Sequence, residues 1–239
     1  MEVQVRIFRG KDLNKKKDDD YQTFIYTGDD NTSVAQILYE LNRRDVLLDT
    51  EGTEREKISW ECSCLVKKCG ACAMRINGIP RLACASFLYE FKSEVVTLEP
   101  LSKFPLVKDL TVDRSSVFEA LKEVSLWLEG EAVMEGETRE CRYGSAKCLM
   151  CGCCLEVCPN FRAGGTFTGA VTPVNAYRIM DEQQKSEHRR SVRRKYNKHY
   201  YEGCGKSLSC RDICPAGIPV DDLIARTNAA AVWGRFKRG

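Results

Sequence analysis

The chain has 239 residues, of which 43% are hydrophobic and 30% charged, and its formal net charge is +3. This composition fits one or two globular domains and excludes a globally disordered chain. Because charges of both signs are mixed along the chain, we expect no nucleic acid among its partners. Its apolar runs fall short of the roughly 20 residues that span a bilayer, so any membrane association is expected to come through a partner.

The first half of the chain is predicted to form a mixed sheet with one helix. Apolar and polar residues alternate over residues 3–7, and a second strand is expected over residues 22–27. Thr32 or Ser33 can cap a helix whose apolar residues recur at helical spacing over residues 34–41.

Two later strands complete this sheet. One is expected over residues 73–76, where the following Asn77-Gly78 predicts a hairpin turn, and the last over residues 95–98. Strand, strand, helix, loop and strands follow one another in the order of the β-grasp fold of plant-type ferredoxins. We therefore predict a β-grasp domain over residues 1–104.

The second half, residues 105–239, is predicted to be α-helical. Asp113 or Ser115 can open its first helix, and further helices are expected over residues 172–190 and 219–233. Four apolar residues should share one face of the first helix: Val117, Phe118, Leu121 and Val124. Because alternating apolar runs are scarce here, we expect this half to be organised around its cysteines rather than around a large apolar core.

Fourteen cysteines would suggest disulfides in a secreted chain, but two observations favour metal ligation. The first 13 residues carry charges where a signal peptide needs an apolar core. Five cysteines crowd into residues 148–158, and neighbours so close cannot all reach separate disulfide partners. We therefore expect a reducing compartment and metal ligands.

One group of four cysteines has the spacing of a plant-type [2Fe–2S] site. Its members are Cys64, Cys69, Cys72 and Cys84. In such a site a loop supplies three thiolates and points its N–H groups at the cluster, and the fourth thiolate arrives after a hairpin. Gly70 lets the backbone pass close to the cluster. The alternative is a structural zinc site, which usually shows two close cysteine pairs instead of one.

The other two groups each end in a cysteine followed by proline. The first is Cys148, Cys151, Cys154 and Cys158, and the second is Cys204, Cys210 and Cys214. In two-cluster ferredoxins the cysteine before proline ligates the other cluster. A [4Fe–4S] cluster is therefore predicted on Cys148, Cys151, Cys154 and Cys214. The remaining set is Cys158, Cys204 and Cys210.

This remaining set is one thiolate short, because Ser207 stands midway between Cys204 and Cys210. A serine hydroxyl stays protonated near neutral pH and is a poor iron ligand, so we expect a [3Fe–4S] cluster here. The alternative keeps four irons with Ser207 or water as a weak ligand. Fewer thiolate charges should raise the potential of this site, so an electron would finish there.

The predicted fold class is thus α+β, a plant-type [2Fe–2S] β-grasp domain followed by an α-helical bacterial-type two-cluster ferredoxin domain. Three cysteines are left over, and we interpret Cys62, Cys141 and Cys153 as small buried residues, although Cys62 could compete for iron. A basic run over residues 189–198 is either a solvated helix face or a contact for anionic lipid headgroups.

Beyond the cysteine order, several stretches carry a family likeness. They are Trp60-Glu61-Cys62-x-Cys64, Cys69-Gly70-Ala71-Cys72-Ala73-Met74-x-Ile76-Asn77-Gly78, and Phe104-Pro105-x-x-x-Asp109-Leu110 with Val112-Asp113-Arg114. Together they resemble the iron–sulfur subunit of the succinate dehydrogenase and fumarate reductase family, over nearly the whole chain.

The resemblance implies an electron-transfer subunit of a succinate:quinone oxidoreductase that has no catalytic residue of its own. Its three clusters would lie in line between an FAD-containing flavoprotein subunit and a membrane-anchor cytochrome b subunit, with quinone at the interface. The chain would be peripheral, at the cytoplasmic face of the cell membrane. The sequence lacks a G-x-G-x-x-G motif after a strand, so catalysis at carbon is expected in another chain.

Two departures from the family pattern favour its menaquinone-using branch. Ubiquinone-using members carry two tryptophans shortly after the Cys-Pro of the second group, whereas here Asn160-Phe161 is followed by Arg162. They also carry a histidine after the cysteine that corresponds to Cys204, where this chain has Gly205. The resemblance therefore implies menaquinone and a dihaem cytochrome b anchor.

Two other functions stay open from the sequence. The chain could serve a different flavin-linked oxidoreductase, and only its flavoprotein partner would discriminate. It could also be an iron–sulfur sensor or a zinc-stabilised interaction module, although three predicted clusters and the lack of a recognisable helix-turn-helix argue against this. Whether electrons leave succinate or reach fumarate is not indicated by the sequence.

Overall fold

The computed structural model describes residues 1–12, 15, 17–129, 139–182 and 187–232, apart from the side chains of residues 181 and 182. It divides into two compact units, Met1–Asp113 and Arg114–Gly239. The end of the first domain was predicted at residue 104, nine residues before the end of the first unit at Asp113. The difference arises because a hairpin of two short strands, β8 (Leu106–Lys108) and β9 (Thr111–Val112), belongs to the first unit.

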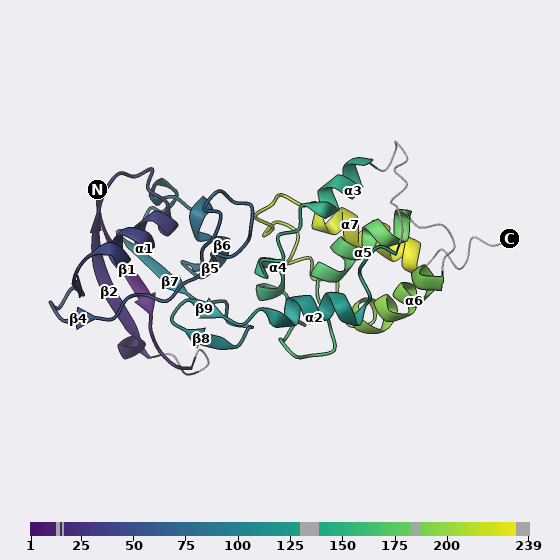
Figure 1. Cartoon of the computed structure of the whole chain (residues 1–239), viewed down its shortest axis with the longest axis horizontal. Coiled ribbons are helices and arrows are strands. Elements are labelled where there is room, and N and C mark those ends of the chain that lie inside the picture. Colours follow the sequence, from purple (N-terminus) through teal and green to yellow (C-terminus); the bar gives the residue numbers. More distant parts are fainter. Residues whose placement is uncertain (13–14, 16, 130–138, 183–186, 233–239) are drawn as a thin grey trace. The chain divides into compact units, whose positions relative to one another are not determined.

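The first unit is built on a five-stranded mixed sheet (Figure 1). In sheet order its strands are β2 (Tyr21–Thr27), β1 (Glu2–Phe8), β7 (Val95–Glu99), β5 (Ala73–Ile76) and β6 (Ile79–Leu82). The pair β1 and β7 is parallel, and the other neighbours are antiparallel. Val3, Val5 and Ile7 are buried, as their alternation predicts, and the order of elements is that of the β-grasp fold.

The helix of this unit, α1 (Val34–Arg43), begins at Ser33 and not at Thr32. Oγ of Ser33 accepts a hydrogen bond from the backbone N of Gln36 at 3.2 Å, which satisfies one of the free N–H groups at the helix start. The apolar face of the helix is buried: Val34, Ala35, Ile37, Leu38 and Leu41.

A tight turn joins β5 to β6 and returns the chain toward Cys72. Asn77 and Gly78 have φ angles of 49° and 81°, the left-handed values that a primed hairpin turn requires at both central positions. The other short elements of this unit are β3 (Leu47–Leu48), β4 (Glu54–Arg55) and the 3-10 turns η2 (Asp18–Asp20), η3 (Ala83–Ala85) and η4 (Leu88–Glu90).

The described part of the second unit is helical, as predicted. Its elements are α2 (Ser115–Glu123), α3 (Arg139–Ala146), α4 (Cys153–Glu156), α5 (Val171–Glu182), α6 (Glu187–Tyr196), the π-helical turn η6 (Asn197–Tyr201) and α7 (Val220–Ala231). Where one helix was expected over residues 172–190, the structure has two, α5 and α6, and residues 183–186 lie outside the described part. The predicted end of the last helix at residue 233 also lies outside it.

The expectation that this unit lacks a large apolar core was wrong. Buried side chains from α5, α6, η6 and α7 form one apolar cluster, to which Met180, Val192 and Leu223 belong. Phe118 is 49% exposed, so it does not share the buried face predicted for α2. Six cysteines lie partly buried against the apolar cluster: Cys141, Cys148, Cys154, Cys204, Cys210 and Cys214.

The basic run of α6 and η6 has two different sides. Three of its residues are exposed and recur every four positions: Arg190, Arg194 and Lys198. On the other side, Nε of Arg193 donates to the carbonyl O of Ala231 at 3.0 Å, and Nζ of Lys195 donates to Oγ of Ser125 at 2.7 Å. Part of the run therefore holds neighbouring segments together, and lipid contact by the exposed residues stays a prediction.

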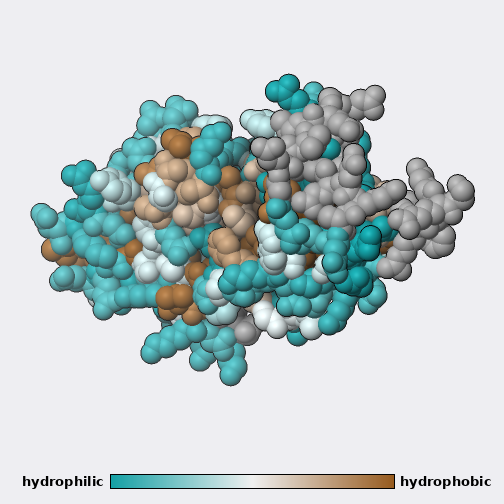
Figure 2. All heavy atoms as spheres, turned by 45° about the vertical axis from the view of Figure 1, so that its right-hand side comes forward, coloured by the Kyte–Doolittle hydropathy of each residue, from teal (hydrophilic) through white to brown (hydrophobic). Residues whose placement is uncertain are grey.

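Hydrophilic residues cover most of the face drawn in Figure 2, and a patch of apolar residues lies among them. Two apolar side chains of the first cysteine loop are exposed, Leu65 by 45% and Val66 by 66%. Among the described residues, no helix combines the length and the apolar character that crossing a bilayer requires.

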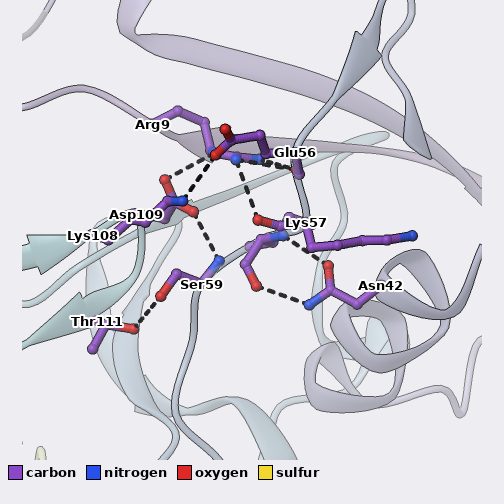
Figure 3. A network of polar contacts seen from close by, with 9 residues as sticks. Arg9, Asn42, Glu56, Lys57, Ser59, Lys108, Asp109 and Thr111 are labelled. Carbon is purple, nitrogen blue, oxygen red and sulfur yellow. Dashed lines mark hydrogen bonds and ion pairs between the residues drawn. The ribbon is translucent and has the colours of Figure 1, made fainter. Parts of the chain in front are cut away.

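A buried ion pair fixes the chain where it enters the first cysteine loop (Figure 3). Nε of Arg9 donates to Oδ1 of Asp109 at 2.9 Å, and its other guanidinium nitrogens donate to the carbonyl O of Glu56. Oδ2 of Asp109 accepts from the backbone N of Ser59 at 2.8 Å. The two side chains are only 9% and 4% exposed. The pair thus ties β1, the β8–β9 hairpin and the segment before Cys64 to one another.

We predict that Asp109→Asn lowers the free energy of unfolding by about 3 kcal/mol, because the Arg9 guanidinium then lacks its buried counter-charge. Urea denaturation followed by circular dichroism measures the change. The matched control is Glu56→Gln, which breaks the exposed pair between Glu56 and Lys108 and should change little. Equal stability of the two variants would contradict a stabilising role of the buried pair.

Candidate metal centres

The loop that carries Cys64 and Cys69 wraps around their sulfur atoms. Leu65, Lys67 and Gly70 have φ angles of 54°, 60° and 76°, so the backbone turns through the left-handed region three times. Alternation of this kind points successive N–H groups into one concavity, which suits an anion. Two of these positions are not glycine, and such strain persists only where the surroundings impose it.

Backbone N–H groups of this loop donate to cysteine sulfurs. Lys68 N lies 3.2 Å and Val66 N 3.5 Å from Sγ of Cys64. Ala71 N lies 3.4 Å from Sγ of Cys69. The hydrogen bonds from Val66 and Lys68 lower the pKa of Cys64 to about 7. The loop therefore favours a negatively charged sulfur, which is the form that binds iron.

Cys72 and Cys84 close the other side of this site. The backbone N of Ala83 donates to the carbonyl O of Cys72 at 3.0 Å, which brings η3 beside the start of β5. Burial raises the pKa of Cys72 to about 12, and a neighbouring Cys84 thiolate adds to this effect. A bare thiolate is unfavourable here, so ligation of Cys72 needs a compensating cation.

Four cysteines of the second unit line one apolar cavity: Cys148, Cys151, Cys154 and Cys214. Its other walls include Val117, Leu155, Val174 and Ile218. Cys214 lies far away in sequence, yet the charge of its thiolate raises the pKa of Cys148 and of Cys154, after burial as the main cause. The structure therefore brings together the set predicted for the [4Fe–4S] cluster.

Two neighbours of Cys151 were not foreseen from the sequence. The Cys153 thiol forms a hydrogen bond with Cys151, and this contact is the main reason why the pKa of Cys151 falls to about 7. Nη1 of Arg114 lies 3.4 Å from the carbonyl O of Cys151, and the Arg114 charge lowers the same pKa. Cys153 is fully buried, as expected, but it acts as a donor and not only as a small apolar residue.

The third predicted set, Cys158, Cys204 and Cys210, also meets in the second unit. Burial raises the pKa of Cys210 to about 11, and thiolates at Cys158 and Cys204 raise it further. Ser207, between them in sequence, is exposed, and its Oγ accepts a hydrogen bond from Oγ of Ser209 at 3.3 Å. Ser207 therefore already has a polar partner near the surface.

A buried tyrosine reaches the third set. The Tyr200 hydroxyl donates to Sγ of Cys204 at 3.4 Å. Burial, followed by this hydrogen bond, raises the pKa of Tyr200 far above its usual value, so the hydroxyl keeps its proton. The hydroxyl of the neighbouring Tyr196 donates instead to Oδ1 of Asn228 at 2.6 Å. The one available sequence signal was the spacing, because Tyr200 lies about one helical turn before Cys204.

The donor sets fit multi-iron clusters. Among the described residues, no three Cys, His, Asp or Glu side chains converge closely enough for one metal ion. The ligands of a cluster each bind a different iron atom, so they need only surround a common volume. Of the other cysteines, Cys62 is exposed, contrary to our interpretation, and Sγ of Cys141 lies 3.9 Å from Oδ2 of Asp222. Ligation of iron by the predicted sets stays a prediction.

Comparison with protein families gives two matches that follow one another along the chain. A model described as "2Fe-2S iron-sulfur cluster binding domain" matches residues 4–119. A second, described as "4Fe-4S dicluster domain", matches residues 144–218. These matches confirm the predicted order of a [2Fe–2S] domain and a two-cluster domain.

Comparison with curated proteins finds relatives with consistent names. The chain is 33% identical over 208 residues to the "Succinate dehydrogenase iron-sulfur subunit" of Bacillus subtilis, covering 83% of this chain and 81% of the relative. It is 29% identical over 187 residues to the "Fumarate reductase iron-sulfur subunit" of Wolinella succinogenes, covering 70% and 75%.

Among solved structures, a chain of the "Mycobacterium smegmatis Sdh1 complex in the apo form" shares the fold. It has a TM-score of 0.79 and 22% identity, and the match covers 99% of this chain and 98% of that one. Both units therefore have counterparts in that chain.

We predict that Cys64 and Cys72 differ in reactivity when the chain is free of metal and fully reduced. Because only the thiolate is alkylated, labelling of Cys64 by iodoacetamide should rise as the pH passes through about 7. Cys72, with a pKa of about 12, should stay unlabelled across the neutral range. Mass spectrometry of tryptic peptides measures both rates, and equal labelling at neutral pH would contradict the loop electrostatics described above.

Proposed function

This chain belongs to the family of iron–sulfur subunits of succinate dehydrogenase and fumarate reductase, and we propose that it conducts electrons between a flavoprotein subunit and membrane quinone. It is an electron-transfer subunit, and reaction at the carbon substrate belongs to another chain. Three clusters would form the path, one in the first unit and two in the second.

The interleaving of cysteines in the second unit carries this proposal. Cys214 lies with Cys148 and Cys154, and Cys158 lies with Cys210. The cysteine before proline in each run therefore lies with the cysteines of the other run. This exchange is characteristic of two-cluster ferredoxins, and a pair of zinc knuckles would not require it. The ligands proposed for the [2Fe–2S] cluster are Cys64, Cys69, Cys72 and Cys84. Those for the [4Fe–4S] cluster are Cys148, Cys151, Cys154 and Cys214, and those for the [3Fe–4S] cluster are Cys158, Cys204 and Cys210.

The first unit is proposed to face the flavoprotein. Leu65 and Val66 expose apolar side chains on the loop around the [2Fe–2S] ligands, where a partner would cover them and shorten the path for an electron. The second unit is proposed to rest on a cytochrome b anchor, which would hold the chain at the cytoplasmic face of the membrane.

Menaquinone is proposed as the quinone, on the two departures of the sequence from the ubiquinone-using pattern, at Arg162 and Gly205. Nδ2 of Asn160 donates to the carbonyl O of Gly203 at 2.7 Å, beside Cys204. A Cβ atom at Gly205 would lie 3.2 Å from the same Nδ2. The hydrogen bond of Asn160 thus links the segment before the first departure, at Arg162, to the segment that holds the second, Gly205.

Metal analysis together with EPR tests the function. The cluster types require about nine iron atoms and about ten sulfides per chain. The oxidised protein should show a nearly isotropic three-iron signal, and reduction with dithionite should add signals of the other two clusters. Zinc in place of iron, or only one cluster, would refute the proposal.

We predict that Ser207→Cys converts the third cluster to four irons. The new thiolate would stand at the missing position, so iron content should rise by about one atom per chain and the oxidised EPR signal should disappear. Ser209→Cys, two residues further on, is the matched control and should leave both unchanged. Persistence of the three-iron signal in Ser207→Cys with a normal iron content would contradict the assignment of this site.

We further predict that the chain, assembled with its flavoprotein and anchor, reduces naphthoquinone analogues in preference to ubiquinone analogues. Steady-state reduction with succinate as donor measures the ratio of kcat/KM values. Reduction of ubiquinone analogues alone would rule out the menaquinone assignment but leave the electron-transfer function intact.

A further inference from the structure

Tyr200 lies in the one π-helical turn of the described chain, directly after α6. In this turn the backbone N of Glu202 bonds to the carbonyl O of Asn197, five residues earlier. Such a turn holds one more residue than an α-helical turn and shifts the side chains that follow, and π-turns are frequent at functional sites. Its effect here is to bury Tyr200 completely while the chain continues to Cys204.

Packing fixes the Tyr200 ring. The side chain is 1% exposed. Its ring stacks on Phe167 with centroids 5.8 Å apart and lies against Tyr196 at 5.1 Å. A ring held on two sides cannot swing its hydroxyl away, so the hydrogen bond to Sγ of Cys204 is set by the fold and not by a mobile side chain.

The acceptor of this hydrogen bond is unusual for a buried hydroxyl. A neutral thiol is a weak acceptor, so a fully buried O–H group would be poorly satisfied by it. A thiolate bound to iron carries negative charge and accepts a much stronger, charge-assisted bond. The position of the Tyr200 hydroxyl therefore matches the iron-bound form of Cys204.

We propose that Tyr200 is a redox-tuning residue that raises the potential of the cluster held by Cys204. The inference rests on the proposed function, which assigns Cys204 to the third cluster. An electron added to the cluster increases the negative charge on its sulfurs, and the O–H donor stabilises that charge more in the reduced state than in the oxidised state. Tyr200 thus acts in the same direction as the missing thiolate at Ser207.

The test compares Tyr200→Phe with Tyr196→Phe in the full chain with its clusters in place. Both changes remove one buried hydroxyl from adjacent, packed tyrosines, but only Tyr200 donates to a cysteine, whereas Tyr196 donates to Asn228. EPR-monitored redox titration of the three-iron signal should give a lower midpoint potential for Tyr200→Phe and an unchanged one for Tyr196→Phe. An unchanged potential in Tyr200→Phe, or equal shifts in both variants, would overturn the proposal.

Two further measurements separate tuning from packing. Pulsed EPR after exchange into D2O should show that one exchangeable proton coupled to the three-iron cluster is lost in Tyr200→Phe and kept in Tyr196→Phe. If Tyr200→Phe fails to load the cluster, replacement of Tyr200 by 3-fluorotyrosine tests the proposal instead. This phenol is nearly isosteric with tyrosine and more acidic, so it is a stronger hydrogen-bond donor. It should therefore raise the midpoint potential of the three-iron cluster. No shift with 3-fluorotyrosine would overturn the proposal.

A Cys204→Ala variant distinguishes failure of this inference from failure of the ligand assignment. Loss of the three-iron signal, with the [2Fe–2S] signal retained, would place the titrated cluster at Cys204. The tyrosine variants would then test only the role of Tyr200 in setting the potential. Survival of the three-iron signal in Cys204→Ala would refute the proposed ligand set and, with it, the role of Tyr200.

Discussion

The constraint that governs this protein is the cost of placing negatively charged sulfur in apolar surroundings. Burial raises the pKa of Cys72, Cys154 and Cys210, so none of them would ionise there without a compensating positive charge. Under the proposed ligand sets, iron would supply that charge, and nearby hydrogen-bond donors would stabilise the remaining negative charge on the sulfurs. The first unit uses the N–H groups of a strained loop, whereas the second uses an apolar cavity with the Arg114 guanidinium beside Cys151.

Under the proposed ligand sets, the same constraint links the clusters to folding. Cys154 lies in the short helix α4 and belongs to the set that begins with Cys148 and is completed by Cys214, shortly before α7. A cluster bound by both would close a long loop of chain and anchor it to the apolar cluster formed by α5, α6, η6 and α7. The apolar core and the proposed metal sites of this unit are therefore parts of one structure. The scarcity of alternating runs did not mean a small core, because alternation is typical of strands and this core is built from helices.

The three proposed sites differ in the features that would stabilise the reduced state of a cluster. The third set has three thiolates, an exposed serine in the fourth position and a buried phenol that donates to Cys204. Each of these features favours the reduced state. Cys151 has a different environment, a neighbouring thiol and a guanidinium close to its carbonyl group. Under the proposed ligand sets, differences in potential along the path would come from local donors and ligand number, and Leu65 and Val66 are the exposed apolar groups proposed to meet the flavoprotein.

The sequence by itself determined the cysteine groups, four of the five strands of the β-grasp sheet, the Asn77-Gly78 turn and the family, because spacing and periodicity are local properties of the sequence. The fifth strand, β6, was not predicted. Only the tertiary structure decided that Ser33 caps α1, that Phe118 faces outward, and that Arg9 pairs with Asp109. It also decided that Tyr200, Arg114 and Cys153 contact the predicted ligands. These contacts depend on packing between distant segments and on one π-helical turn, and no residue spacing encodes where a packed side chain places its polar atom.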